Sequence, residues 1–126
     1  MKGRILVADD DPASLDLLQA FLESRGYEVT RAADGNHAVE LGSDGDFDVA
    51  VIDVHMPVYE GVEIVELLRR RHLLHPLKVI ALTGDVSRSL HLALAAAGID
   101  SYLTKPVELS ELESEVTRLT AATRSA

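Results

Sequence analysis

The chain has 126 residues, of which 47% are hydrophobic and none is cysteine, and its 21 acidic and 12 basic residues give a net charge of −9. This length suits one globular domain, while the acidic balance argues against a basic nucleic-acid groove and the missing cysteine excludes disulfides and thiolate metal sites. No apolar run reaches the length of a membrane span or resembles a signal peptide, so we expect a cytoplasmic protein.

Short apolar runs alternate with longer amphipathic stretches, which is typical of strand and helix units wound around a parallel sheet. The predicted strands, in chain order, are Ile5–Ala8, Glu28–Ala32, Val49–Ile52, Val79–Leu82 and Tyr102–Leu103. Helical spacing of leucines predicts the intervening helices. The first opens at Pro12 and is closed by Gly26, and the others are Asn36–Gly42, Val62–Leu68, Ser87–Ala97 and a last helix whose apolar face is Leu109, Leu112, Val116 and Leu119.

We expect one domain over residues 1–126, with an ordered core of about 3–120. The polar residues 121–126 are expected to fray, as chain ends do when nothing holds them. Arg69–Arg71 follow the third predicted helix, and their charge suits the negative end of a helix dipole. We interpret them as a C-terminal cap rather than a binding patch.

Polar residues stand at or just past the ends of four of the five predicted strands: Asp9, Asp10 and Asp11, then Asp53, then Thr83, then Lys105. In a parallel α/β sheet, ligands bind beyond the carboxyl ends of the strands, where the strand order reverses. Carboxylates gathered there repel one another unless a cation lies between them. Oxygen ligands without sulfur favour Mg²⁺. Such a site, with Lys105 and Thr83, can stabilise a transferring phosphoryl group, and Asp53 is the best-placed nucleophile.

These residues carry a resemblance to a known family, the receiver domains of bacterial response regulators in two-component and phosphorelay signalling. The similarity extends from Ile5 to about Leu119, and the matching stretches are Leu6–Asp11, Val51–Pro57 with Gly61 after it, Ala81–Gly84 and Tyr102–Pro106. The resemblance implies a doubly wound (βα)₅ fold of the flavodoxin type, in which a parallel sheet of order 2-1-3-4-5 lies between two layers of helices.

The resemblance also implies roles for the residues at the strand ends. Asp53 would be the phosphoacceptor and would bind Mg²⁺ directly, together with Asp10 and the backbone carbonyl of His55, while Asp9 would help through water. Thr83 and Lys105 would contact the phosphoryl oxygens, and the Lys105–Pro106 bond would be cis, a form found almost only before proline. Asp11 would be a turn residue.

In this family the signal is read through a conformational switch. Thr83 would move toward the phosphoryl group and Tyr102 would turn inward, changing a surface made by the fourth helix, fifth strand and fifth helix, where Arg88 and Arg118 are also candidates for contact. His55 and Asp85, each two residues past a key side chain, are hypothesised to tune the phosphoryl lifetime. The other histidines, His37, His72, His75 and His91, are interpreted as surface residues.

The resemblance implies a histidine kinase or histidine phosphotransfer protein as donor, and a downstream protein or fused output domain as target. The stretches His55–Pro57 and Lys105–Val107 resemble those of receivers attached to hybrid kinases. No direct nucleic-acid or membrane binding is expected, and the only catalysis expected is of the domain's own phosphorylation and dephosphorylation. Dimerisation stays open.

Three alternatives differ in class. A haloacid-dehalogenase-like phosphatase would need an aspartate at the position of His55, and a flavodoxin-like electron carrier would not place Asp9, Asp10 and Asp11 beside a phosphate. The third alternative is a receiver-shaped interaction module that is never phosphorylated. The presence of Asp10, Asp53, Thr83 and Lys105 together argues against it.

Overall fold

A computed structural model describes residues 1–44, 46–54, 61–71, 77–84 and 87–125. Two residues of the predicted site, His55 and Asp85, lie outside the described residues, as do His72 and His75. The strands are β1 (Gly3–Ala8), β2 (Tyr27–Ala32), β3 (Val49–Asp53), β4 (Lys78–Thr83) and β5 (Ser101–Thr104). The helices are α1 (Pro12–Ser24), α2 (Gly35–Asp44), α3 (Gly61–Arg71), α4 (Arg88–Ala97) and α5 (Leu109–Ser125). Within the described parts of the chain, no helix combines the length and apolar character needed to cross a membrane.

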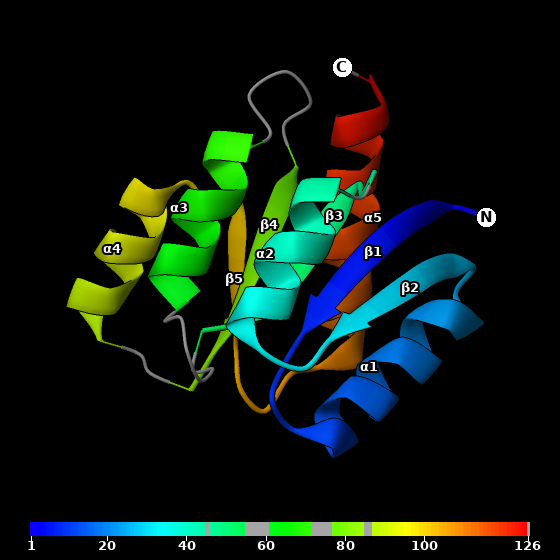
Figure 1. Cartoon of the computed structure of the whole chain (residues 1–126). Helices are drawn as coiled ribbons and strands as arrows, with labels where there is room; N and C mark the ends of the chain where they lie inside the picture. Colours follow the sequence, from blue (N-terminus) through cyan, green and yellow to red (C-terminus); the bar gives the residue numbers. More distant parts are fainter. Residues whose placement is uncertain (45, 55–60, 72–76, 85–86, 126) are drawn as a thin grey trace.

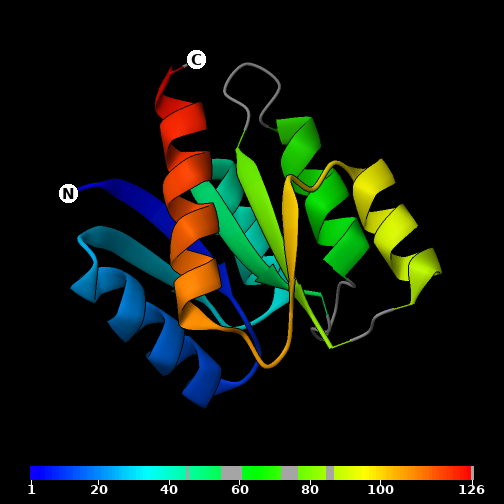
Figure 2. The same cartoon turned by 180° about the vertical axis from the view of Figure 1, so that it is seen from behind.

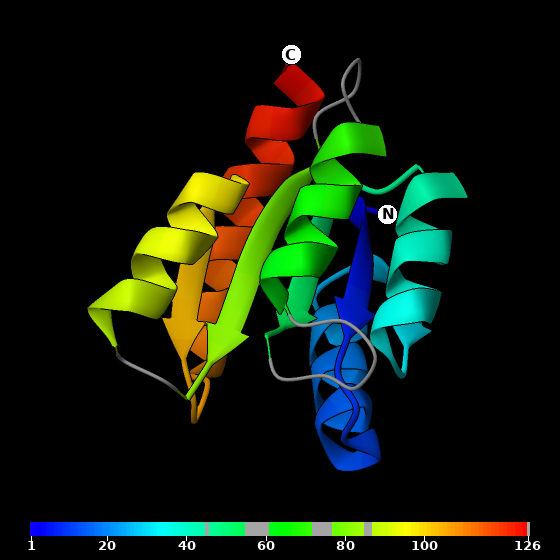
Figure 3. The same ribbon diagram turned by 60° about the vertical axis from the view of Figure 1, so that its left-hand side comes forward.

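The five strands form one parallel sheet of order β2-β1-β3-β4-β5. All of them point toward the same end of the molecule (Figure 1). α2, α3 and α4 cover one face of the sheet (Figure 3), and α1 and α5 cover the other (Figure 2). The predicted doubly wound fold and strand order are therefore confirmed, and the order reverses between β1 and β3.

The alternation of side chains along the strands divides the core into two faces. Ile5 and Val7 of β1 pack with α1 and α5, whereas Leu6 and Ala8 pack with α2 and α3. A third group, on the α4 side, joins Leu94 to side chains from β4 and from the residue after β3. Both faces are apolar because both are covered, which is why these strands read as continuous hydrophobic runs.

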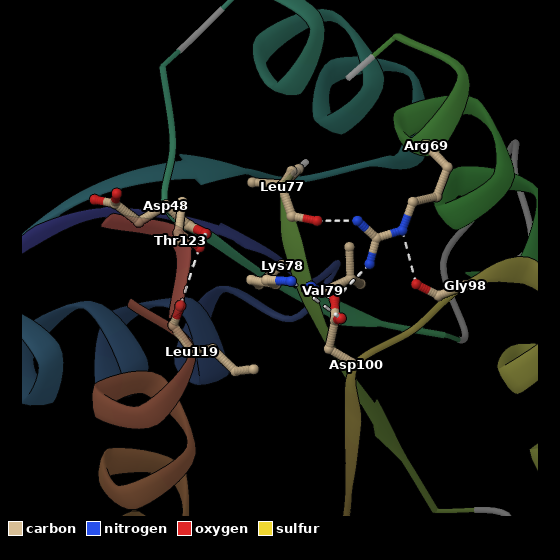
Figure 4. Close-up of polar contacts among 9 residues, drawn as sticks. All are labelled: Asp48, Arg69, Leu77, Lys78, Val79, Gly98, Asp100, Leu119 and Thr123. Atoms are coloured by element: carbon tan, nitrogen blue, oxygen red, sulfur yellow. Dashed lines mark hydrogen bonds and ion pairs between the residues drawn. The ribbon is translucent and has the colours of Figure 1, made fainter. Parts of the chain in front are cut away.

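The end of α5 differs from the expectation that residues 121–126 fray, because the helix continues to Ser125. The hydroxyl of Thr123 donates to the backbone carbonyl of Asp48 at 3.0 Å (Figure 4), and Arg124 Nη2 lies 3.1 Å from Asp48 Oδ2. The same carboxylate accepts from the backbone N–H of Arg4 at 2.8 Å. Asp48 therefore ties the last turn of α5 to the beginning of the sheet.

Arg69 does not act as the predicted cap of its own helix. Its guanidinium leaves α3 and donates to the carbonyl of Gly98 at 2.7 Å, to the carbonyl of Leu77 and to the carboxylate of Asp100 (Figure 4). The carbonyls are thereby satisfied where α4 turns into β5 and where β4 begins. Arg70 stays largely exposed and pairs only loosely with Glu66 at 3.9 Å.

Candidate functional site

Three carboxylates converge at the carboxyl end of the sheet, where β1 and β3 end side by side. Ala8 is the partner of Ile52, so continuing the register by one residue sets Asp9 opposite Asp53. Ligand oxygens of Asp9, Asp10 and Asp53 all lie within 4.8 Å of one another. Asp9 and Asp53 are 1% and 3% exposed, whereas Asp10 faces solvent. The site is thus a buried acidic pair with a third carboxylate at its rim.

Asp9 is buried with only part of its hydrogen-bonding capacity used. Its Oδ1 accepts the backbone N–H of Asp11 at 2.9 Å, but its Oδ2 has no hydrogen-bond partner among the described residues. Burial raises the pKa of Asp9, and the charge of Asp53 adds to the rise, while the Asp11 N–H and Lys105 oppose it. A buried, partly unsatisfied carboxylate oxygen is a position that a cation would stabilise.

Lys105 supplies a fixed positive charge to the same pair. Its Nζ lies 2.8 Å from Asp53 Oδ2 and 3.8 Å from Asp9 Oδ2. Burial lowers the pKa of Lys105, but the hydrogen bond to Asp53 and the neighbouring carboxylate charges outweigh it and raise that pKa overall. The backbone N–H of Lys105 donates to the carbonyl of Thr83 at 2.8 Å, and the Lys105–Pro106 bond is cis.

Thr83 ends β4 and is fully buried. Its partner in register is Thr104, and two residues earlier Ala81 is the partner of Tyr102. Because alternate residues share a face, Thr83 and Tyr102 lie on the same side of the sheet, the side that α4 covers. Tyr102 is 45% exposed, so its ring is turned outward.

The ring of Tyr102 contacts an aromatic partner that the sequence did not reveal. His91 of α4 lies with its ring centroid 4.2 Å from that of Tyr102, at an interplanar angle of 34°. The interpretation of His91 as an ordinary surface residue is incomplete, because the structure shows it half-buried in this contact. No sequence spacing signals the pair, because the two residues come from different elements.

The donor set fits a hard divalent cation. The described ligands are carboxylate oxygens without sulfur or imidazole, which is the preference of Mg²⁺, and the exposed Asp10 leaves the site open to water. The backbone carbonyl of His55, predicted as a further ligand, lies outside the described residues. Asp11 was predicted to be a turn residue, and the structure makes it the N-cap of α1, since its side chain accepts from the N–H of Ala13 at 3.1 Å.

Residues 5–117 match the family model of the response regulator receiver domain. The chain belongs to the response regulator receiver family. Among curated relatives, this receiver is 39% identical over 109 residues to the transcriptional regulatory protein TcrA of Mycobacterium tuberculosis, a match that covers 86% of this chain and 42% of TcrA. The chain therefore spans less than half the length of that relative.

Solved structures agree with this assignment. The receiver superimposes on the receiver domain of the Francisella response regulator 1452 with a TM-score of 0.89 and 33% identity, covering 96% of this chain and 98% of that one. It also resembles the receiver domain of the sensor histidine kinase PA1611 from Pseudomonas aeruginosa PAO1, with a TM-score of 0.86, 29% identity and coverage of 94% and 98%. That protein holds a magnesium ion coordinated in its active-site cleft.

Proposed function

We propose that this receiver accepts a phosphoryl group on Asp53 in a Mg²⁺-dependent reaction. The observation that carries the proposal is the position of the Asp53 carboxylate, which is buried, within 4.8 Å of the other two acidic ligands and 2.8 Å from Lys105 Nζ. A carboxylate so placed is a nucleophile beside fixed positive charge. Asp10, Asp53 and the carbonyl of His55 would hold the ion directly, and Asp9 would hold it through water.

In the proposed reaction an Asp53 oxygen attacks the phosphorus of a phosphohistidine. A new O–P bond forms as the P–N bond breaks, and the departing imidazole keeps the electron pair and takes up a proton from solvent. Bound Mg²⁺ would neutralise charge on the phosphoryl oxygens. Lys105 Nζ, now on Asp53, would reach a phosphoryl oxygen, and the hydroxyl of Thr83 would approach another from the end of β4. Hydrolysis of the resulting acyl phosphate would return Asp53 to a carboxylate.

The donor in this proposal is a histidine kinase or a histidine phosphotransfer protein. The phosphorylated state would be read by a downstream protein or a fused output domain through the face of α4, β5 and α5. Tyr102 lies exposed on β5, and Arg88 and Arg118 lie exposed on the flanking helices. Phosphorylation would add about −1.5 to −2 charges at the site, and the inward movement of Thr83 and Tyr102 would carry that change to this face.

Intact-mass spectrometry after incubation with acetyl phosphate and Mg²⁺ tests the acceptor. We expect one phosphoryl adduct in the wild type and in Asp16→Asn, whose side chain lies exposed on α1, and none in Asp53→Asn or with excess chelator. An adduct that persists in Asp53→Asn would place the acceptor elsewhere. A wild type that takes neither an adduct nor beryllofluoride would instead be an interaction module that works without phosphorylation.

The proposal extends to the phosphoryl lifetime, which His55 and Asp85 would set by orienting or repelling the attacking water. Autodephosphorylation would be timed in His55→Ala and Asp85→Ala. We expect the lifetime to change in at least one variant, and two unchanged lifetimes would remove both residues from the mechanism while leaving Asp53 as the acceptor.

A further inference from the structure

His91 and Tyr102 form an aromatic pair on the side of the sheet that carries Thr83. The ring centroids lie 4.2 Å apart with the planes tilted by 34°, slightly closer than the roughly 4.5–7 Å at which aromatic pairs usually pack, so the two rings are in direct contact. α4 lies on the β5 side of the sheet (Figure 3), and the His91–Tyr102 contact joins the two elements. The pair therefore joins a helix and a strand that both belong to the proposed output face.

The fold positions His91 for this contact. Leu94, one turn later in α4, is fully buried against Ala81 and Val54, so that stripe of the helix faces the sheet. His91 precedes Leu94 by three residues and lies on nearly the same stripe. Since Ala81 is the register partner of Tyr102, the buried contact of Leu94 and the ring contact of His91 lie side by side.

The contact exists only while Tyr102 points outward. In the described state the Tyr102 ring is 45% exposed and leans on His91, and Thr83 lies two residues past Ala81 on the same face. A ring turned inward toward Thr83 would have to leave its partner. Any contact that only one of two conformations makes shifts the equilibrium toward that conformation.

We propose that His91 is a brace that holds Tyr102 in its outward position and so sets how readily this receiver switches. The proposal rests on the proposed function, in which Tyr102 turns inward on phosphorylation. His91 is a positioning residue here, because in this proposal it acts through the ring of Tyr102. Removing the brace should raise the inward population before any phosphoryl group arrives.

The test compares His91→Ala with two matched variants. Leu92→Ala changes the next residue of α4, which is 59% exposed, and His91→Phe keeps an aromatic ring at the same place. Loss of an aromatic contact should lower the beryllofluoride concentration needed for half-saturation in Mg²⁺ by about two- to tenfold in His91→Ala. Leu92→Ala should match the wild type, and His91→Phe should restore most of the difference.

A second measurement reports the switch itself. The backbone amide signal of Thr83, at the end of β4, should move in unliganded His91→Ala toward its position in the beryllofluoride-bound wild type, whereas it should stay at the wild-type position in Leu92→Ala. A wild type that ignores beryllofluoride would overturn the proposed function and the brace together. A wild type that responds, while His91→Ala matches Leu92→Ala in half-saturation and in the Thr83 signal, would overturn the brace alone.

Discussion

Replacing Asp9 by asparagine should stabilise the metal-free protein, although it removes part of the site. At an effective dielectric constant of about 20, two unit charges at the 4.8 Å that bounds these carboxylates repel by about 3 kcal/mol. Lys105 Nζ, 3.8 Å from Asp9 Oδ2, returns about 4 kcal/mol of attraction. The repulsions of Asp9 by Asp10 and Asp53 together therefore exceed its attraction to Lys105. Burial adds a further cost to the charged form of Asp9.

Asparagine keeps the oxygen that accepts the Asp11 N–H and removes the charge. After allowance for solvent around the exposed Asp10, we expect Asp9→Asn to raise the free energy of unfolding by about 1–2 kcal/mol without metal. For a domain of 126 residues this corresponds to a rise of roughly 4–8 °C in the thermal midpoint.

Mg²⁺ should reverse this order of stability, so that the wild type becomes more stable than Asp9→Asn. A ligand that binds only the folded state stabilises it by about 1.4 kcal/mol at ten times its Kd and by about 2.7 kcal/mol at a hundred times. The wild type should gain this stability and Asp9→Asn should gain much less. Thermal unfolding of both proteins across a Mg²⁺ titration measures the crossing, with Glu40→Gln, exposed on α2, as the control for loss of a surface carboxylate.

The pH dependence has a definite sign. The pKa of Asp9 is raised in the folded state, so its contribution favours folding below the pKa of the unfolded chain and is lost as pH rises through the folded pKa. The advantage of metal-free Asp9→Asn should therefore shrink as pH falls through that raised pKa. A variant less stable than the wild type without metal at neutral pH, or one that gains as much from Mg²⁺, would refute the electrostatic account of the site.

Three further changes test other parts of the structure. Lys105→Ala should slow phosphorylation by acetyl phosphate about 10²–10³-fold in intact-mass time courses. The same change should tighten Mg²⁺ binding, because the ammonium group of Lys105 no longer competes with the ion for the Asp53 carboxylate. An unchanged Mg²⁺ affinity would contradict that competition. Arg69→Met should lower the free energy of unfolding, measured with urea, by about 1–3 kcal/mol, because the carbonyls of Leu77 and Gly98 lose their hydrogen-bond donor. Arg70→Met, at an exposed position of the same helix, should change it by less than about 0.5 kcal/mol. Gly98→Ala should lower the free energy of unfolding by about 1–2 kcal/mol in the same assay, because this residue has a φ of +103° and an added Cβ would lie 3.1 Å from Arg69 Nε. An unchanged urea midpoint would count against backbone strain at this position.

The fold and the location of the site could be predicted because both depend on patterns within short segments. Apolar runs and helical spacing located all five strands and all five helices, and the main error in their bounds is the end of α5, which continues to Ser125. The rule that polar residues gather past the strand ends then brought Asp9, Asp53 and Lys105 together. The three side chains meet because each points to the face of the sheet that α1 and α5 cover. The sequence does not show which face a residue takes, because these strands are apolar on both faces.

The contacts that the sequence did not reveal all join residues far apart in the chain. Thr123 and Arg124 have the polar composition of a loose tail, and only the fold brings Asp48 beneath them. Arg69 had an acceptable role at the end of its own helix, yet its long side chain crosses to another layer. His91 and Tyr102 meet because of the distance and angle at which α4 packs on the sheet, which no local spacing encodes.

The parallel sheet also separates the two ends of the molecule by role. The carboxyl ends of all five strands point toward the end of the molecule that holds the acidic site, while the beginning of β1 and the last turn of α5 lie at the opposite end (Figure 1). A fluorophore, an affinity tag or a whole additional domain attached at either end would therefore stand clear of Asp53. Asp48 fixes the last turn of α5 to the sheet. A label attached after α5 would therefore be held close to a fixed orientation relative to the receiver.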